Sequence, residues 1–159
     1  VAMEMRVLAA DPFVPAERAK AMGVESVDFE QLIMLSDFIT VHPPLTASTT
    51  GMIGAEQIAR MKDGVRLINV ARGGIIEEAA LIEALKARRI AGAGIDAFER
   101  EPLPSDSPLW NLDNVVISPH ASGVTPEMWE GRRQVLRQNL ARFLANEPFL
   151  YVCDKRAGF

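Results

Sequence analysis

Residues 67–74 decide the fold, and they read Leu67-Ile68-Asn69-Val70-Ala71-Arg72-Gly73-Gly74. The stretch begins as a short apolar run, which is typical of a strand buried on both faces of a parallel sheet. Its two glycines do not continue a strand comfortably, and Glu77 and Glu78 then suit the positive end of a following helix. Arg72 is therefore expected at the carboxyl end of a strand, where open α/β sheets bind ligands. The alternative is a surface arginine in a turn, although the glycines would let the backbone approach a ligand closely.

On both sides of this stretch, apolar runs alternate with helical patterns. Further strands are predicted at 6–10, 26–27, 38–41, 93–96 and 115–117, and helices at 15–23, 55–61, 79–88 and 125–145. Asp28 is expected to begin another short helix through a capping box, and Thr125 is expected to cap the last one. The proline-containing segment 98–112 is predicted to be a long loop. The alternation predicts an α/β fold with a doubly wound parallel sheet.

The last predicted helix, 125–145, carries an apolar face. Its members are Val135, Leu136, Leu140, Phe143 and Leu144.

Composition and charge exclude several classes of protein. The 159 residues are 48% hydrophobic with a net charge of −4, so no nucleic-acid partner is expected. No apolar run approaches the roughly 20 residues that a membrane helix needs, so no membrane partner is expected either. Cys153 is the only cysteine, which fits a reducing cytoplasm. Two separated histidines do not suggest a metal site.

Chemically active side chains follow five of the predicted strands. They are Asp11, His42, Arg72, Asp96 and His120. The carboxyl ends of parallel strands share one edge of the sheet, so we expect these residues to border one site. His42 has two interpretations, a ligand contact or simply part of the turn made by the two prolines after it.

The two aspartates among these residues have different expected roles. At the end of the first strand, Asp11 would accept hydrogen bonds from the adenine-ribose hydroxyls of a dinucleotide and repel a 2′-phosphate. Its alternative is a turn starter before Pro12. Asp96 closes an apolar strand, where an unpaired charge is costly. It therefore needs a donor, either a ligand amide or a nearby backbone N–H.

Three residues together suit the reversible reduction of a carbonyl group. Arg72 would bind the carboxylate and carbonyl of a 2-oxo acid. His120 would protonate the carbonyl oxygen as hydride arrives from a nicotinamide, and Glu101 would hold the imidazole tautomer. His120 and Glu101 lie in loops just beyond strand ends, so we expect these two side chains to be in contact. Taken singly, His120 could be a structural histidine, and Glu101 could be a solvated loop acid.

Three motifs of the chain resemble the signatures of the D-isomer-specific 2-hydroxyacid dehydrogenases, a family that includes phosphoglycerate, glycerate and hydroxypyruvate enzymes. They are Asn69–Gly74, Gly94–Pro102 and Ser118-Pro119-His120-Ala121-Ser122-Gly123. The resemblance runs in order over nearly the whole chain. It implies a Rossmann-like NAD-binding domain, with NAD as the cofactor and a small 2-hydroxy or 2-oxo acid as the substrate.

The resemblance also implies roles for individual residues. The catalytic set would be Arg72, Glu101 and His120. The NAD contacts would be Asp11, His42, Pro43, Val70, Ala71, Arg72, Asp96, His120, Ser122 and Gly123, and no metal is implied.

One departure from the family pattern is large. The glycine-rich loop Gly-x-Gly-x-x-Gly and the strand before it should lie just upstream of Val1, and the sequence does not contain them. In this fold that strand is central, so the sheet should have a gap between the strands ending near Asp11 and Val41. We therefore expect a fragment that lacks the pyrophosphate cradle and is inactive alone. Residues 1–146 would be part of the dinucleotide-binding domain, and residues 147–159 a tail returning to a substrate domain.

Other functions remain open at this stage. A non-catalytic NAD-sensing corepressor of the same fold would keep the same three residues. A formate-type dehydrogenase is disfavoured because Glu101 stands where that branch has glutamine. The whole protein is expected to be a cytoplasmic homodimer, and the sequence does not name its substrate.

Overall fold

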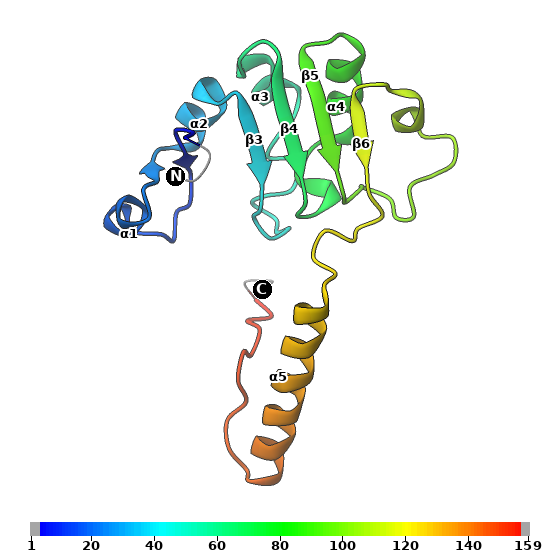
Figure 1. The fold of residues 1–159 in the computed structure, drawn as a ribbon. Helices are drawn as coiled ribbons and strands as arrows, with labels where there is room; N and C mark the ends of the chain where they lie inside the picture. Colours follow the sequence, from blue (N-terminus) through cyan, green and yellow to red (C-terminus); the bar gives the residue numbers. More distant parts are fainter. Residues whose placement is uncertain (1–3, 157–159) are drawn as a thin grey trace.

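The centre of the computed structural model, which describes residues 4–156, is a four-stranded parallel sheet (Figure 1). The strands are β3 (Phe38–Val41), β4 (Val65–Asn69), β5 (Ile90–Ile95) and β6 (Val115–Ile117), hydrogen-bonded in that order. Val41 and Ile95 both pair with Asn69, and Ile95 pairs with Ile117. The four carboxyl ends are therefore level at one edge of the sheet. The segments that follow them start from this edge and carry all the predicted site residues except Asp11.

Helices α2 (Phe29–Leu35), α3 (Ala55–Arg60) and α4 (Glu78–Lys86) directly precede β3, β4 and β5 in the chain. The predicted capping box of α2 is confirmed, because Asp28 Oδ1 accepts from the Gln31 N–H at 2.7 Å and the Gln31 side chain accepts from the Asp28 N–H at 3.4 Å. The core lies between α3, α4 and the sheet, where Leu67, Leu85 and Ile90 are fully buried. This apolar burial is the main force holding the sheet in place.

Strands β1 (Leu8–Ala9) and β2 (Glu25–Ser26) form a separate two-stranded parallel sheet around α1 (Ala16–Ala21). Among the described residues, no strand pairs with β3 on the side away from β4. The β1–β2 sheet and the sheet that begins with β3 are thus not joined, as expected if the central strand between the strands ending near Asp11 and Val41 is not in this sequence. Phe38, at the start of β3, is half exposed at this edge.

Helix α5 (Pro126–Leu144) leaves the sheet and projects away from it, with the tail running back alongside (Figure 1). Thr125 caps it as predicted, since its Oγ1 accepts from the Met128 N–H at 3.1 Å. The helix has no buried residue. Apart from the partly buried Val135, its predicted apolar face is exposed, because among the described residues only the tail packs along it. Asn139 joins the tail to the helix through two hydrogen bonds with the backbone of Leu150.

The segment 98–112 is more ordered than the predicted loop. It contains the 3-10 helix η2 (Pro108–Asn111), which Ser107 caps by accepting from the Leu109 N–H. The buried Leu109 anchors the segment in the core. Pro108 is the first residue of this short helix, and proline is well suited to a first helical turn.

In the part of the chain that the structure describes, no helix has both the length and the apolar character needed to cross a lipid bilayer.

Candidate active site

The turn after β4 is shaped by a buried amide side chain, that of Asn69. Asn69 is 2% exposed; its Oδ1 accepts from the Ala71 N–H at 3.0 Å and its Nδ2 donates to the Arg72 carbonyl at 2.9 Å. Both ends of the amide are thus satisfied by the backbone that follows the strand. Sequence reasoning did not give Asn69 this role, although a polar residue inside an apolar run was a signal for it.

The next residues, the 3-10 turn η1 (Gly73–Ile75), pack tightly on a distant loop. A Cβ atom added to Gly73 would lie 1.9 Å from the carbonyl carbon of Phe98. The absence of a side chain therefore lets two backbone segments meet. This contact places Arg72 beside the loop that carries Glu101.

Arg72 is exposed at the carboxyl edge, and its Nη1 donates to the Ala71 carbonyl at 2.7 Å. The planar guanidinium has five N–H donors, a fork suited to a carboxylate. Its charge also contributes to the low pKa of Glu101, after larger causes. The arginine is thus close enough to the predicted acid–base pair to act on it electrostatically.

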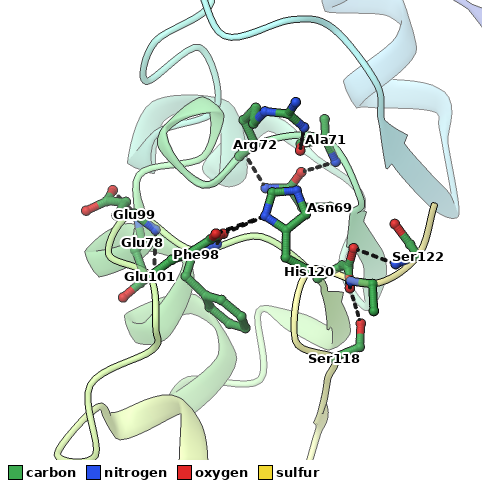
Figure 2. Close-up of polar contacts among 12 residues, drawn as sticks. Asn69, Ala71, Arg72, Glu78, Phe98, Glu99, Glu101, Ser118, His120 and Ser122 are labelled. Atoms are coloured by element: carbon green, nitrogen blue, oxygen red, sulfur yellow. Dashed lines mark hydrogen bonds and ion pairs between the residues drawn. The ribbon is translucent and has the colours of Figure 1, made fainter. Parts of the chain in front are cut away.

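Glu101 and His120 are in direct contact, as predicted (Figure 2). The His120 Nδ1 lies 2.9 and 3.0 Å from the two carboxylate oxygens, and the Phe98 N–H donates to Glu101 Oε1 at 3.0 Å. The hydrogen bond with His120, followed by the bond from Phe98, lowers the pKa of the Glu101 carboxyl below its ordinary value. A charged carboxylate is an acceptor only, so Nδ1 carries the proton and Nε2 is left for chemistry.

The loop that carries His120 is held by Asp96, which is 2% exposed. Its carboxylate accepts from the Ser118 hydroxyl at 2.5 Å and from the N–H groups of Ala121 and Ser122 at 2.8 and 3.0 Å (Figure 2). Burial raises the pKa of Asp96, but these hydrogen bonds outweigh burial and hold the pKa well below its usual range. The donors that Asp96 was predicted to need therefore include N–H groups and a hydroxyl of its own chain. His120, at φ 53°, lies within the loop so fixed.

The three residues predicted to be catalytic line one cavity of about 730 Å³. Arg72, Glu101 and His120 border it together with Gly73, Gly74 and Phe98, and the loop at Leu45, Thr50 and Gly51 closes another side. Two further acids, Glu77 and Glu99, also line the cavity. A cavity of this volume is in the range of small-molecule sites. The structure therefore brings together one permanent cation, one imidazole and the carboxylate that the imidazole contacts around a space for a small ligand.

The remaining predicted residues lie outside the lining of this cavity. All but Asp11 follow strands of the four-stranded sheet; Asp11 follows β1 in the separate two-stranded sheet, so the expectation that it shares their edge is wrong for this chain, in which no strand joins the two sheets among the described residues. His42 directly follows β3 and its Nε2 lies 3.0 Å from Thr40 Oγ1. Asp11 follows β1, where its Oδ1 accepts from the Phe13 N–H at 2.8 Å, so it does start a turn. Pro43, Val70 and Ala71 follow β3 and β4, and Ser122 and Gly123 follow His120 in the loop after β6. Within residues 4–156, no three side chains of metal-binding type cluster together.

A parallel α/β sheet with an arginine and a histidine–carboxylate pair at its carboxyl edge is an arrangement that suits the nicotinamide-dependent dehydrogenases of oxo and hydroxy acids. A family model described as "D-isomer specific 2-hydroxyacid dehydrogenase, NAD binding domain" matches residues 1–122. The chain belongs to this family.

Known proteins resemble the chain over most of its length. It is 55% identical over 147 residues to a D-3-phosphoglycerate dehydrogenase of Archaeoglobus fulgidus, covering 92% of this chain and 28% of the relative. An NADPH-dependent glyoxylate/hydroxypyruvate reductase of Sinorhizobium meliloti, solved with NADP and sulfate, has a TM-score of 0.87 at 30% identity. That match covers 99% of this chain and 51% of the reductase.

A D-lactate dehydrogenase of Lactobacillus jensenii, solved with NAD⁺, has a TM-score of 0.85 at 30% identity over 96% of this chain and 49% of that chain. The chain thus spans less than a third of the Archaeoglobus relative and about half of the two solved structures.

Proposed function

We propose that this chain is part of an NAD-dependent enzyme that interconverts a D-2-hydroxy acid and a 2-oxo acid. The observation that carries the proposal is the His120–Glu101 pair, which lines the same cavity as Arg72 at the carboxyl edge of the sheet. The share of the relatives that the chain covers supports its being one section of a longer protein.

Each of the three residues has a separate task in this proposal. Arg72 binds the substrate carboxylate with its guanidinium fork and so orients the neighbouring carbonyl. His120 donates the Nε2 proton to the carbonyl oxygen during reduction and takes it back during oxidation. Glu101 keeps the Nδ1 proton in place and stabilises the imidazolium. The nicotinamide, when bound, supplies or accepts the hydride at the carbon of that carbonyl.

The predicted NAD contacts would meet two parts of the dinucleotide. Asp11 follows β1, where it would meet the adenine ribose. Pro43, Val70, Ala71, Asp96, Ser122 and Gly123, together with His42, would border the nicotinamide half. Gly123 supports this fit, because a Cβ added there would meet no atom within 4 Å and the backbone is open to a ligand. The glycine-rich loop that would hold the pyrophosphate is not in this sequence, and we propose that it precedes Val1 in the whole protein.

The remaining organisation is also a proposal. Residues 1–146 would complete their domain with the upstream strand, and residues 147–159 would return to a substrate domain. We propose that the whole protein is a cytoplasmic homodimer. The exposed apolar side chains of α5 support a partner surface in it. Sedimentation of the purified whole protein would give its mass and test the dimer.

The substrate we propose is a short 2-oxo acid such as hydroxypyruvate or its phosphate, as the name of the Archaeoglobus relative suggests. Oxidation of NADH by the whole protein in the presence of these acids tests the proposal. An NAD-sensing corepressor would bind NADH without turnover, so binding in the absence of any turnover would contradict an enzymatic function.

Arg72→Lys should lower kcat/KM for the 2-oxo acid at least about tenfold, or about 1.4 kcal/mol of transition-state stabilisation. Lysine keeps the charge but loses the two parallel hydrogen bonds to a carboxylate. Arg100→Lys is the matched control, because Arg100 is exposed and does not line the cavity. Equal losses in the two variants, or no loss with Arg72→Lys, would remove Arg72 from the site.

Asp11→Ser should weaken NADH binding and relax the rejection of NADPH. A carboxylate beside the adenine ribose accepts hydrogen bonds from its hydroxyls and repels a 2′-phosphate, whereas serine does not repel it. The ratio of kcat/KM values with NADH and NADPH measures the effect, with Asp106→Ser, at an exposed position of the segment 98–112, as control. The role of Asp11 would be rejected if the unmodified enzyme used both cofactors equally well.

A further inference from the structure

Two glutamates outside the catalytic set exchange hydrogen bonds across a sequence separation of 21 residues (Figure 2). The Glu78 N–H, in the first turn of α4, donates to Glu99 Oε1 at 2.8 Å. In return the Glu99 N–H donates to Glu78 Oε2 at 3.3 Å. Each carboxylate thus satisfies a backbone N–H of the other segment. We call this reciprocal pair the 78–99 latch.

The latch closes on the backbone that orients Glu101. The N–H of Phe98 donates to Glu101, and the next N–H along the chain, that of Glu99, donates to Glu78. Gly73 packs against the same peptide, since its added Cβ would also lie 2.4 Å from the Glu99 nitrogen. Three segments therefore meet at one peptide group, and they carry Arg72, the N-terminus of α4 and Glu101.

The latch holds two carboxylates close together, which has an electrostatic cost. Burial raises the pKa of Glu78, and the negative charge of Glu99 raises it further, against a hydrogen bond from the Glu99 N–H that lowers it. The positive end of the α4 dipole offsets part of the cost at Glu99. Glu99 also lines the cavity. Neither glutamate hydrogen-bonds to His120 or Arg72, so the proposed proton transfer does not use them directly.

We propose that Glu78 and Glu99 are positioning residues that fix Glu101, and through it His120, relative to Arg72. The segment 98–112 is long, and after the buried Phe98 its residues Glu99, Arg100 and Glu101 are exposed. This exposed part needs an attachment to keep the carboxylate of Glu101 on the imidazole. The latch supplies this attachment to α4, the helix that follows the Arg72 segment. The kinetic consequence rests on the proposed dehydrogenase function, whereas the structural consequence does not.

The kinetic test compares three variants of the whole protein. Glu99→Ala should lower kcat for reduction about tenfold with KM for NADH unchanged, since catalytic geometry is lost but the cofactor contacts remain. Glu99→Gln should retain kcat within about twofold, because the amide oxygen still accepts from the Glu78 N–H. Arg100→Ala, at the neighbouring exposed position, should behave as the unmodified enzyme. Equal losses of kcat in Glu99→Ala and Glu99→Gln would overturn the positioning role of the 78–99 latch.

A second measurement does not depend on turnover. The ¹⁵N signals of the His120 ring, assigned by their loss in His120→Gln, report the hydrogen bond at Nδ1. Glu99→Ala should move these signals, and Glu99→Gln and Arg100→Ala should leave them in place. Signals that stay in place in Glu99→Ala would overturn the proposal, whatever happens to kcat.

The two measurements also separate the latch from the proposed function. Signals that move in a protein without any turnover would reject the dehydrogenase and retain the positioning role. Glu78→Gln guards against a variant that fails to fold, because its amide oxygen accepts from the Glu99 N–H and its charge is gone. This variant should keep both kcat and the His120 signals, and a loss of both in the folded variant would overturn the proposal.

Discussion

Replacing His120 by alanine should lower the turnover number about 10³-fold and leave the affinity for NADH nearly unchanged. Among the described residues that line the cavity, the His120 imidazole is the only side chain placed to pass a proton while held by a carboxylate, at 2.9 Å from Glu101. Its proposed target is the substrate oxygen, so the dinucleotide keeps its own contacts. Stopped-flow turnover and NADH fluorescence titration measure the two quantities separately.

Glu101→Gln is the companion variant. The amide still accepts from Nδ1 but no longer stabilises the imidazolium, so the loss in kcat should be smaller than with His120→Ala. The hydrogen bond with His120 is the first cause that lowers the pKa of Glu101 below its ordinary value, so this carboxylate stays ionised to lower pH than a free glutamate. Protonation of Glu101 should therefore not limit reduction at pH 5 or above.

Wild-type turnover in His120→Ala would exclude proton transfer by this histidine.

Gly73→Ala should lower the free energy of unfolding by about 3 kcal/mol and remove most activity. The new methyl group would meet the backbone of Phe98 at 1.9 Å, and backbone atoms cannot move aside as a flexible side chain does. Separating the two segments would also part Arg72 from Glu101. Thermal or urea unfolding of the whole protein and turnover together measure the effect.

Gly74→Ala is the matched control for this change. A Cβ at Gly74 would lie 3.5 Å from the Leu45 side chain, which is an ordinary van der Waals distance. Both glycines belong to the same 3-10 turn, so differences in local propensity are small. Similar stability for the two variants would show that the segments at Gly73 and Phe98 have room to separate.

Local sequence patterns predicted most of the elements. Asp28 and Thr125 predicted two helix starts, because caps act over three residues of the chain. Strand β5 is longer than predicted, because Ile90 begins it and is fully buried. The 3-10 helix at Pro108–Asn111 was missed, since short turns of this kind have little periodicity to detect.

The sequence by itself determined the alternation of strands and helices and the positions of Arg72, Asp96 and His120 just beyond strand ends. It also predicted that Glu101 contacts His120. These conclusions need only side-chain periodicity, turn chemistry and the rule that parallel strands share a carboxyl edge.

Only the tertiary structure decided how the site is fixed. The donors to Asp96, the turn held by Asn69 and the 78–99 latch all depend on which backbone N–H groups face which carboxyl or amide groups. Two of these three arrangements join residues more than 20 positions apart. Such pairs leave no periodic trace in a sequence, because they are set by the register of the sheet and the paths of its loops.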